Sequence, residues 1–461
     1  MHTENLNALR HEGLIVDLFA GGGGFSVGCE QAFQRPVSIA LNHDPEAVAL
    51  HTANHPRTRH ICQDFETADP LEVTRNEPVF WLHASPSCTQ HSRSRRALPA
   101  EKQARDHGWK VIEWIEKTRP VIFSCENVPE YRKWGPLDAH GFPDKDRQGE
   151  TFEEWKNAIT RLGYRLEWRD INAADLGAAT ARVRMLIVAR RDNMPICWPD
   201  EHFGPGREND WNPSGDHIDW WKPAPSIFTR KKPPVQATLN RIAKGIKRYI
   251  IDNPTPYRAP DHARISNPRF ETKGAKIAAF MAQNHAQLPG RSLNDPLSTI
   301  CSKAAGQSLV TLSYIDIARS GSIGLDPAGP LGTITSRGDH HAEVRIEAFA
   351  AGYYSQGGGQ LHDLNEPIGT ITTRDRFAVV EIESVKSIIL DIGYRFLTAD
   401  ELWSITGFPD DYKRSVVAKG RPMPATAQKR MIGNAVVPIV AKAVVAANLK
   451  TYDNDNLKMA A

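Results

Sequence analysis

Cysteine is scarce in this sequence and follows no metal-binding or disulfide pattern. The 461 residues include six cysteines, no two of which form a Cys-x-x-Cys pair or a zinc-ligand spacing. This absence argues against a zinc finger and against the disulfide framework of a small secreted domain. We therefore expect a protein of the reducing cytoplasm that holds no metal ion.

Long apolar runs and a strong net charge are also lacking. The first residues carry Glu4, Arg10 and His11 rather than an apolar core, so we expect no secretory signal. We also expect no membrane span, because no run approaches about 20 apolar residues. The net charge of +3 neither requires nor excludes a polyanionic partner. A globular chain of this length predicts roughly two to three domains.

A glycine-rich loop follows the first apolar run of the chain. The run 14–16 leads into the loop 17–24, whose last four residues are glycines, and a helix-like segment, 25–33, comes next. Glycines let a backbone adopt positive φ and approach a ligand, and a strand, glycine turn and helix form a common nucleotide-binding opening. The nicotinamide fingerprint G-x-G-x-x-G fails, because Ser26 stands in place of its third glycine. Alone, the loop is equally consistent with an ordinary tight turn.

Strand-like and helix-like segments alternate as far as about residue 190. Apolar runs at 37–42, 79–82 and 121–125 are separated by helical patterns at 45–51 and around 111–115. This alternation predicts an α/β fold with a doubly wound, mostly parallel, Rossmann-like sheet. Ligands of such sheets collect at the carboxyl ends of the strands, so the residues that follow each strand are the candidates for chemistry.

Polar and reactive side chains stand at these strand ends. Asn42 and His43 follow the second strand and Asp64 follows the third, where each can reach a ribose or a base edge but can equally cap a helix. After the fourth strand, Cys88 lies in a polar loop with three arginines, which favour the nucleophilic thiolate. Glu126 follows the fifth strand, so we expect it at the same edge of the sheet as Cys88.

Several short motifs occur in the order found in one enzyme family. They are Phe19-Ala-Gly-Gly-Gly23, Pro86-Ser-Cys88, Glu126-Asn-Val128, Arg182-Val-Arg184, the pair Arg395-Phe-Leu-Thr398 with Gly407-Phe-Pro409, and Gly433-Asn-Ala-Val436. On these motifs the sequence resembles the DNA (cytosine-5) methyltransferases of bacteria and phages. The resemblance implies methyl transfer from S-adenosyl-L-methionine to carbon 5 of a cytosine that is flipped out of a specific double-stranded DNA sequence.

The resemblance also implies which residues bind the methyl donor. Phe19 would lie against the adenine, Asp64 near the adenine amino group, and Asn42 near the ribose. The full set that it implies is Phe19, Gly21, Gly23, Asn42, His43, Asp64 and Asn434.

Four positions depart from the family pattern. Ser87 replaces a usual second proline, Thr180 and Met431 replace glutamines, and Asn42 replaces an acid. The last departure weakens the ribose assignment, because an amide binds a diol less strongly than a carboxylate does.

The implied catalytic residues are Cys88, Glu126, Arg182 and Arg184. Carbon 5 of cytosine is a poor nucleophile until a nucleophile adds at carbon 6, and Cys88 is the candidate for that addition. Glu126, placed in an apolar pocket, would hold a proton for N3, and Arg184 would donate to O2. Arg182 would support the Cys88 loop or bind a phosphate. The base must leave the stack to reach these groups.

The helical periodicity ends near residue 196, and the sequence that follows is interrupted by proline and tryptophan residues, which predicts irregular structure. A basic amphipathic helix is predicted within 230–249, with residues such as Lys244 on its outer face. Such a face fits a phosphate backbone or is simply solvated. Three Pro-x-x-Thr-Ile-type repeats follow about every 35 residues. After each repeat comes a β-branched run, at 309–312, 344–346 and 378–382, that predicts a strand. Their loops, which carry Arg337 and Arg374, are candidates for reading base edges.

Helical patterns return at the C-terminal end. Thr398 and Glu401 have the spacing of a capping box, and the apolar helix 436–449 is predicted to pack on the N-terminal sheet. We therefore expect a catalytic and cofactor-binding domain at 1–195, a β-rich target-recognition domain at 196–390, and a segment 391–461 that returns to the catalytic domain.

Other functions remain open at this point. The alternatives are an RNA cytosine-5 methyltransferase, a catalytically silent DNA-binding protein of the same fold, and an oxidoreductase that the failed glycine spacing disfavours. The expected partners are double-stranded DNA and a cognate restriction endonuclease, with no membrane, and the expected state is a monomer.

Overall fold

The chain forms two compact units. The first comprises residues 1–212, 298–304 and 402–461, and the second comprises 213–297 and 305–401. The structure, a computed structural model, describes residues 3–86, 102–232, 234–264, 275–283, 290–300, 307–316, 378–382 and 385–459. The expected functional boundaries near residues 195 and 390 remain predictions.

A seven-stranded sheet, in the order β3-β2-β1-β4-β5-β8-β6, forms the centre of the first unit. All neighbouring strands are parallel except that β8 runs antiparallel to β5 and β6. The predicted doubly wound, mostly parallel sheet is therefore confirmed. The strands are β1 (Leu14–Leu18), β2 (Ile39–Asn42), β3 (Arg59–Cys62), β4 (Val79–Ala84), β5 (Ile122–Asn127), β6 (Arg165–Asn172) and β8 (Val183–Arg190).

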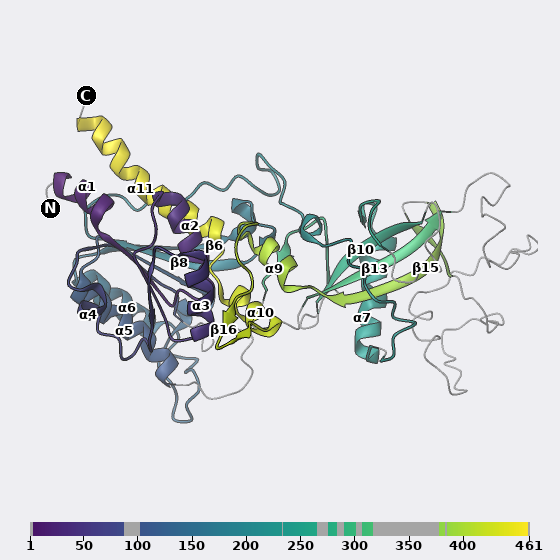
Figure 1. The fold of residues 1–461 in the computed structure, drawn as a ribbon, viewed down its shortest axis with the longest axis horizontal. Coiled ribbons are helices and arrows are strands. Elements are labelled where there is room, and N and C mark those ends of the chain that lie inside the picture. The colour runs from purple at the N-terminus through teal and green to yellow at the C-terminus, as the bar shows by residue number, and fades with distance from the viewer. Residues whose placement is uncertain are drawn as a thin grey trace, which may run out of the picture. The chain divides into compact units, whose positions relative to one another are not determined.

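Helices cover both faces of this sheet (Figure 1). One face packs against α1 (Thr3–Glu12), α2 (Gly24–Phe33) and α11 (Pro438–Met459). The other packs against α5 (Lys102–Thr118), α6 (Glu150–Arg161) and the short α4 (Pro70–Thr74). Side chains alternate between the two layers along each strand, so that Leu186 and Val188 of β8 face α11 whereas Met185 and Ile187 face α5 and α6. This burial on both faces explains the continuous apolar runs in the sequence.

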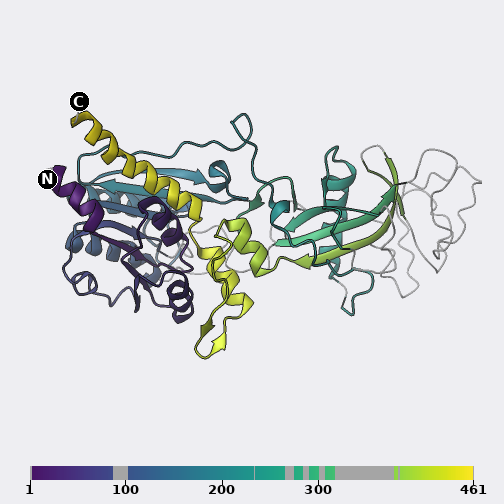
Figure 2. The same ribbon diagram turned by 45° about the horizontal axis from the view of Figure 1, so that its top comes forward.

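The helices α2 and α11 lie in direct contact (Figure 2). A Cβ atom on Gly28 would stand 2.1 Å from the carbonyl oxygen of Pro438, and one on Gly24 would stand 1.9 Å from that of Val436. Only glycine fits at either position. The predicted packing of the last helix on the N-terminal sheet is confirmed, and it brings the C-terminal segment to the start of α2.

The described residues contain one helical stretch, Ala425–Tyr452, that is long and apolar enough to cross a membrane by length and composition. It joins α10 (Ala425–Asn434) to most of α11. The expectation that the chain has no membrane span stays a prediction. Of its most apolar window, 67% is buried inside the protein, as in the core helix of a soluble fold.

The second unit is built on a six-stranded antiparallel sheet. Its path is β11-β10-β13-β15-β14, with β9 paired to β10. The strands are β9 (Tyr257–Arg258), β10 (Lys276–Gln283), β11 (Gly290–Ser292), β13 (Gln307–Asp316), β14 (Ala378–Ile382) and β15 (Val385–Phe396). The strands that were expected after the first and third repeats fall in β13 and β14. The second repeat, Arg337 and Arg374 lie outside the described residues.

One face of this sheet is covered by α7 (Gln236–Ile246), which continues into a single π-helical turn, Lys247–Ile251. Leu239, Ile242 and Ile246 are buried against strand residues such as Phe280. Lys244 is exposed on the opposite side. The predicted amphipathic helix with a basic outer face is therefore present.

Shorter elements complete the chain. The helix α9 (Ala399–Thr406) begins with the predicted capping box, in which Glu401 N donates to Thr398 Oγ1 at 3.2 Å and Thr398 N donates to Glu401 Oε2 at 2.7 Å. The same carboxylate accepts two hydrogen bonds from Arg395, at 2.6 and 2.8 Å. The remaining elements are α3 (Pro45–Asn54), β7 (Thr180–Ala181), β12 (Leu297–Ser298), β16 (Val417–Ala418) and β17 (Arg421–Pro422).

Candidate functional site

The glycine loop lies at the carboxyl end of β1, where the strand order reverses between β1 and β4. Gly21 and Gly23 have φ of +50° and +83°, a region that side chains rarely adopt. Gly23 precedes α2 and gives it no side-chain cap, so the first amides of the helix are not satisfied by a capping side chain. Open amides at the N-terminus of a helix favour a polar or anionic ligand group.

Phe19 begins this loop in a strained conformation, with φ of +63°. Its ring lies 4.3 Å from that of Phe65 and 5.5 Å from that of His107, measured between centroids. Together the three rings form an aromatic cluster beside the loop, which suits a flat heterocycle. Sequence reasoning identified Phe19 but missed Phe65, which directly follows Asp64, and His107 of α5.

Asn42 is the last residue of β2, and Asp64 lies two residues after the end of the neighbouring strand β3. Asn42 Oδ1 accepts a hydrogen bond from Asp44 N at 2.9 Å, so its oxygen closes a local turn and only its amide group is left for a ligand. Asp64 is exposed, and its Oδ1 accepts from Glu66 N at 3.0 Å. His43 is exposed between them. The structure thus places all three at the edge of the sheet that carries the glycine loop.

Tyr412, from the C-terminal segment, fixes the back of the loop. Its hydroxyl donates to the carbonyl oxygen of Gly22 at 2.7 Å. A Cβ atom on Gly23 would stand 2.4 Å from the same hydroxyl. Packing against Tyr412 therefore requires glycine at position 23, whether or not a ligand approaches the loop. Asn434 is exposed at the end of α10, whose Met431 packs near the loop glycine Gly22.

Glu126 and Arg184 form an ion pair at this edge. Glu126 lies within β5 rather than after it, and Arg184 stands near the start of the antiparallel neighbour β8. Arg184 Nε is 3.0 Å from Glu126 Oε1, although it lacks the alignment of a hydrogen bond. The side chains are only 12% and 8% exposed. Two largely buried opposite charges so close together are expensive to desolvate, which points to a functional reason for them.

Asn127 fixes the chain that leaves β4. Its Nδ2 donates to the carbonyl oxygen of Pro86 at 3.3 Å, and its Oδ1 accepts from Val128 N at 2.9 Å. This amide thus joins the end of β5 to the last described residue before the polar loop. Cys88 itself lies outside the described residues, so its role remains a prediction.

Arg182 is buried rather than directed to solvent. Its Nη1 donates to the carbonyl oxygens of Ile300 at 3.2 Å and Gly433 at 3.0 Å. The guanidinium group therefore joins three separate segments of the first unit. These contacts favour a structural role and argue against the binding of a phosphate.

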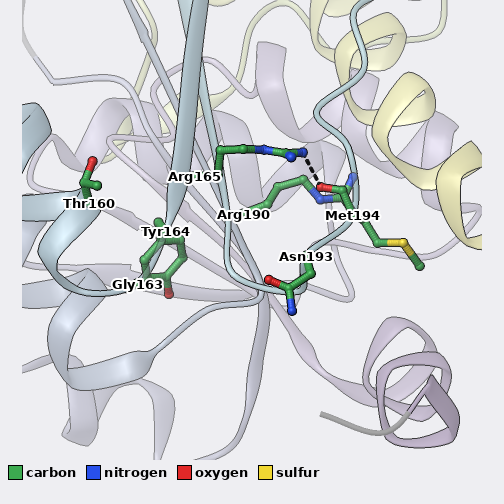
Figure 3. A pocket seen from close by; sticks show the side chains of 7 residues that line it. All are labelled: Thr160, Gly163, Tyr164, Arg165, Arg190, Asn193 and Met194. Atoms are coloured by element: carbon green, nitrogen blue, oxygen red, sulfur yellow. Dashed lines mark hydrogen bonds between the residues drawn. The ribbon is translucent and has the colours of Figure 1, made fainter.

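A separate hollow of about 380 Å³ lies at the opposite end of the sheet (Figure 3). Arg165 crosses it and donates to the carbonyl oxygen of Met194 at 2.6 Å, and Tyr164 beside it donates to Pro120, before β5. The hollow is therefore at the amino ends of the parallel strands, away from the glycine loop. Arg190, which also lines the hollow, forms an ion pair with Asp192, with 2.7 Å between Nη2 and Oδ2. None of the predicted site residues lines this hollow.

The chain matches the C-5 cytosine-specific DNA methylase family model over residues 14–450. It belongs to this family. The match runs through both units of the methylase, from β1 into α11, and it is consistent with a methyl donor and a DNA substrate. Family membership does not favour the oxidoreductase, the RNA enzyme or the silent DNA-binding protein.

Curated relatives are similar to part of the methylase. The Type II methyltransferase M1.HphI of Haemophilus parahaemolyticus is 27% identical over 209 residues, which are 44% of this chain and 51% of that protein. M.SacI of Streptomyces achromogenes is 23% identical over 223 residues, 44% of this chain and 54% of that protein. The chain thus matches about half the length of these relatives. Among solved structures, the S. pombe Dnmt2 methyltransferase covers 96% of this chain and 98% of its own, with 13% identity and a TM-score of 0.48.

The contact between Tyr412 and the loop gives a testable prediction. Gly163 has φ of +88° with open space around its Cβ position. Gly163→Ala should therefore lower the free energy of unfolding only by the cost of the backbone strain, about 1–2 kcal/mol. Gly23→Ala should lower the free energy of unfolding by more than this, because the methyl group also meets the Tyr412 hydroxyl. Adding Tyr412→Phe to Gly23→Ala should restore part of the difference. Urea denaturation of the variants measures all these values, and equal losses at Gly23 and Gly163 would contradict the assigned clash.

Proposed function

We propose that this methylase transfers a methyl group from S-adenosyl-L-methionine to carbon 5 of cytosine in double-stranded DNA. The observation that carries the proposal is the buried Glu126–Arg184 pair at the edge of the sheet that bears the glycine loop. A carboxyl group and a guanidinium group side by side match the N3 and O2 edge of cytosine, which needs one proton and one hydrogen-bond donor. The family match over residues 14–450 supports the same reaction.

The residues around the glycine loop fit S-adenosyl-L-methionine. The aromatic cluster of Phe19, Phe65 and His107 suits the adenine ring. The exposed carboxylate of Asp64 can accept from the adenine amino group, and the amide group of Asn42 can reach the ribose. The backbone at Gly21 and Gly23 can approach the ligand closely. When bound, the donor supplies a methyl group on a positively charged sulfur.

Cys88 is the proposed nucleophile. Its thiolate adds to carbon 6 of the cytosine, which turns carbon 5 into an enamine-like centre that can accept the methyl group. Loss of the proton from carbon 5 then expels the thiolate and restores the aromatic ring. The arginines of the same polar loop favour the thiolate form.

Glu126 and Arg184 would act on the opposite edge of the base. In the absence of a base the guanidinium group of Arg184 lies against the carboxyl group of Glu126. When cytosine enters, we expect Arg184 to move its donor to O2, which leaves Glu126 free to share a proton with N3. The ion pair is thus a resting arrangement that the substrate replaces.

The second unit would select the DNA sequence. The exposed basic face of α7 suits the phosphate backbone, whereas loop residues such as Arg337 and Arg374 are proposed to contact base edges. The names of the relatives, Type II methyltransferases, support a role in restriction and modification. A cognate restriction endonuclease is therefore the proposed biological partner.

The reaction is tested by incubating the methylase with S-adenosyl-L-methionine labelled in its methyl group. Duplex DNA should acquire label as 5-methylcytosine, and tRNA should not. Glu126→Gln should slow transfer by about a hundredfold or more, because an amide cannot supply the N3 proton. Binding of the donor, followed by titration calorimetry, should stay unchanged in this variant.

Glu154→Gln is the matched control, because Glu154 is an exposed glutamate of α6. It should methylate at the wild-type rate. Labelling of tRNA in preference to DNA, or full activity of Glu126→Gln, would contradict the proposed function.

The roles in the second unit are tested by salt dependence and by mapping the methylated sites. Lys244→Ala should weaken binding to all DNA sequences alike and flatten the dependence of affinity on salt. Asn240→Ala, an uncharged exposed position of the same helix, should leave the salt slope unchanged. Arg337→Ala or Arg374→Ala should instead alter the methylated sequence, at about 1–3 kcal/mol for each lost base contact. If all variants methylate the same sites and show the same dependence of DNA affinity on salt, the DNA contacts lie elsewhere.

A further inference from the structure

A chain of four hydrogen-bonded side chains runs beneath the glycine loop. Asp17 of β1 accepts from Ser26 Oγ of α2 through its Oδ2 at 2.7 Å. Ser26 Oγ lies 3.0 Å from His51 Nε2, and His51 Nδ1 lies 2.8 Å from His60 Nε2 on β3. We call these four residues the proton chain.

The proton chain connects a buried carboxyl group to a more accessible histidine. Asp17, Ser26 and His51 are at most 1% exposed, whereas His60 is half-buried. Asp17 Oδ1 has no hydrogen-bond partner among the described residues. Burial raises the pKa of Asp17 to about 7, and the hydrogen bond from Ser26 opposes this shift. Burial also lowers the pKa of His51 well below its usual value, so His51 stays neutral.

The proton chain is complete in both charge states of Asp17. With the carboxylate ionised, His60 Nε2–H donates to His51, His51 Nε2–H donates to Ser26, and the hydroxyl donates to Asp17. When a proton binds at His60 Nδ1, the hydrogen on His60 Nε2 can move to His51 Nδ1. The hydrogen on His51 Nε2 can then move to Ser26 Oγ, and the hydroxyl hydrogen of Ser26 to Asp17 Oδ2. His60 then keeps the new hydrogen, and the last one protonates Asp17 Oδ2. Every hydrogen bond is retained with its direction reversed, and one proton has been taken up.

Asp17 lies in β1 at the base of the glycine loop. It lies two residues before Phe19, and its hydrogen bond to Ser26 spans the whole glycine loop. The methyl donor carries a positive sulfur, whereas the product of methyl transfer, S-adenosylhomocysteine, carries a neutral one. An ionised carboxylate in this buried place attracts the first more than the second.

We propose that Asp17 is a specificity-determining residue that favours the charged methyl donor over the neutral product, with its proton exchanged through His60. This inference rests on the proposed use of S-adenosyl-L-methionine. It gives the enzyme a way to bind the donor and release the product from the same loop.

Other titratable groups surround Asp17 on every packed element. The negative charge of Glu30 on α2 adds to the upward shift of the pKa of Asp17. On β4, His83 is paired in register with Asp17, and burial lowers its pKa to about 3, so it remains neutral. Burial raises the pKa values of Cys29 and Tyr412, so both stay protonated. The fifth neighbour, His55, is paired with Glu30 at 3.0 Å. Of the four groups whose pKa values are shifted by burial here, Asp17, His83, Cys29 and Tyr412, only Asp17 has its pKa near 7.

The direction of the pH dependence follows. Below about pH 7 Asp17 is neutral, and above it the carboxylate is ionised. The preference for the donor over the product should therefore rise between pH 6 and pH 8, on the order of threefold to tenfold. The ratio of the two dissociation constants is the informative quantity, because the amino, carboxyl and adenosine groups that both ligands share cancel in it.

The test is titration calorimetry of the full chain with S-adenosyl-L-methionine and with S-adenosylhomocysteine at pH 6, 7 and 8. Asp17→Asn should make the ratio independent of pH. Ser26→Ala removes the hydrogen bond that lowers the pKa of Asp17, so it should move the midpoint to higher pH. His140→Gln, at an exposed histidine far along the chain, should reproduce the wild-type profile.

The outcomes separate this inference from the proposed function. If the wild-type chain binds both ligands with a ratio that does not change with pH, the role of Asp17 is wrong and the cofactor assignment stands. If His140→Gln alters the profile as Asp17→Asn does, Asp17 is not the source of the dependence. If neither ligand binds at any pH, both proposals fail.

Discussion

Close backbone packing around the glycine loop is the constraint on which the site depends. The loop glycines leave room for Tyr412 and Trp403, and Gly24 leaves room for the backbone of Val436. A side chain at Gly23 or Gly24 would collide with the C-terminal segment. These contacts hold the C-terminal segment against the loop that follows β1.

Much of the fold followed from the sequence. The alternating apolar runs gave the parallel sheet because both of its faces are buried, and the Thr398–Glu401 spacing gave the capping box because that bond is local. The amphipathic pattern of α7 likewise depends on neighbours three and four residues apart. Strand ends located Asn42, Asp64 and Glu126 at one edge, since parallel strands all end there.

The features that sequence reasoning missed depend on long-range contacts. Tyr412 meets Gly22 across 390 positions of the chain, and no local pattern reveals that hydrogen bond. Arg182 was expected to support the Cys88 loop or to bind a phosphate, and no local pattern reveals its hydrogen bonds to the carbonyl groups of Ile300 and Gly433. The proton chain was missed because its members come from four separate elements.

The proposed reaction combines the buried Glu126–Arg184 pair with covalent catalysis by Cys88, a nucleophile that only the sequence identifies. The most direct test exposes the methylase to duplex DNA in which 5-fluorocytosine replaces cytosine, with S-adenosyl-L-methionine present. Fluorine cannot leave carbon 5 as a proton does, so the thiolate cannot be expelled. Mass spectrometry should find the base attached to Cys88, and Cys88→Ala should form no adduct. An adduct at another cysteine such as Cys62, or substantial methyl transfer by Cys88→Ala, would contradict the mechanism.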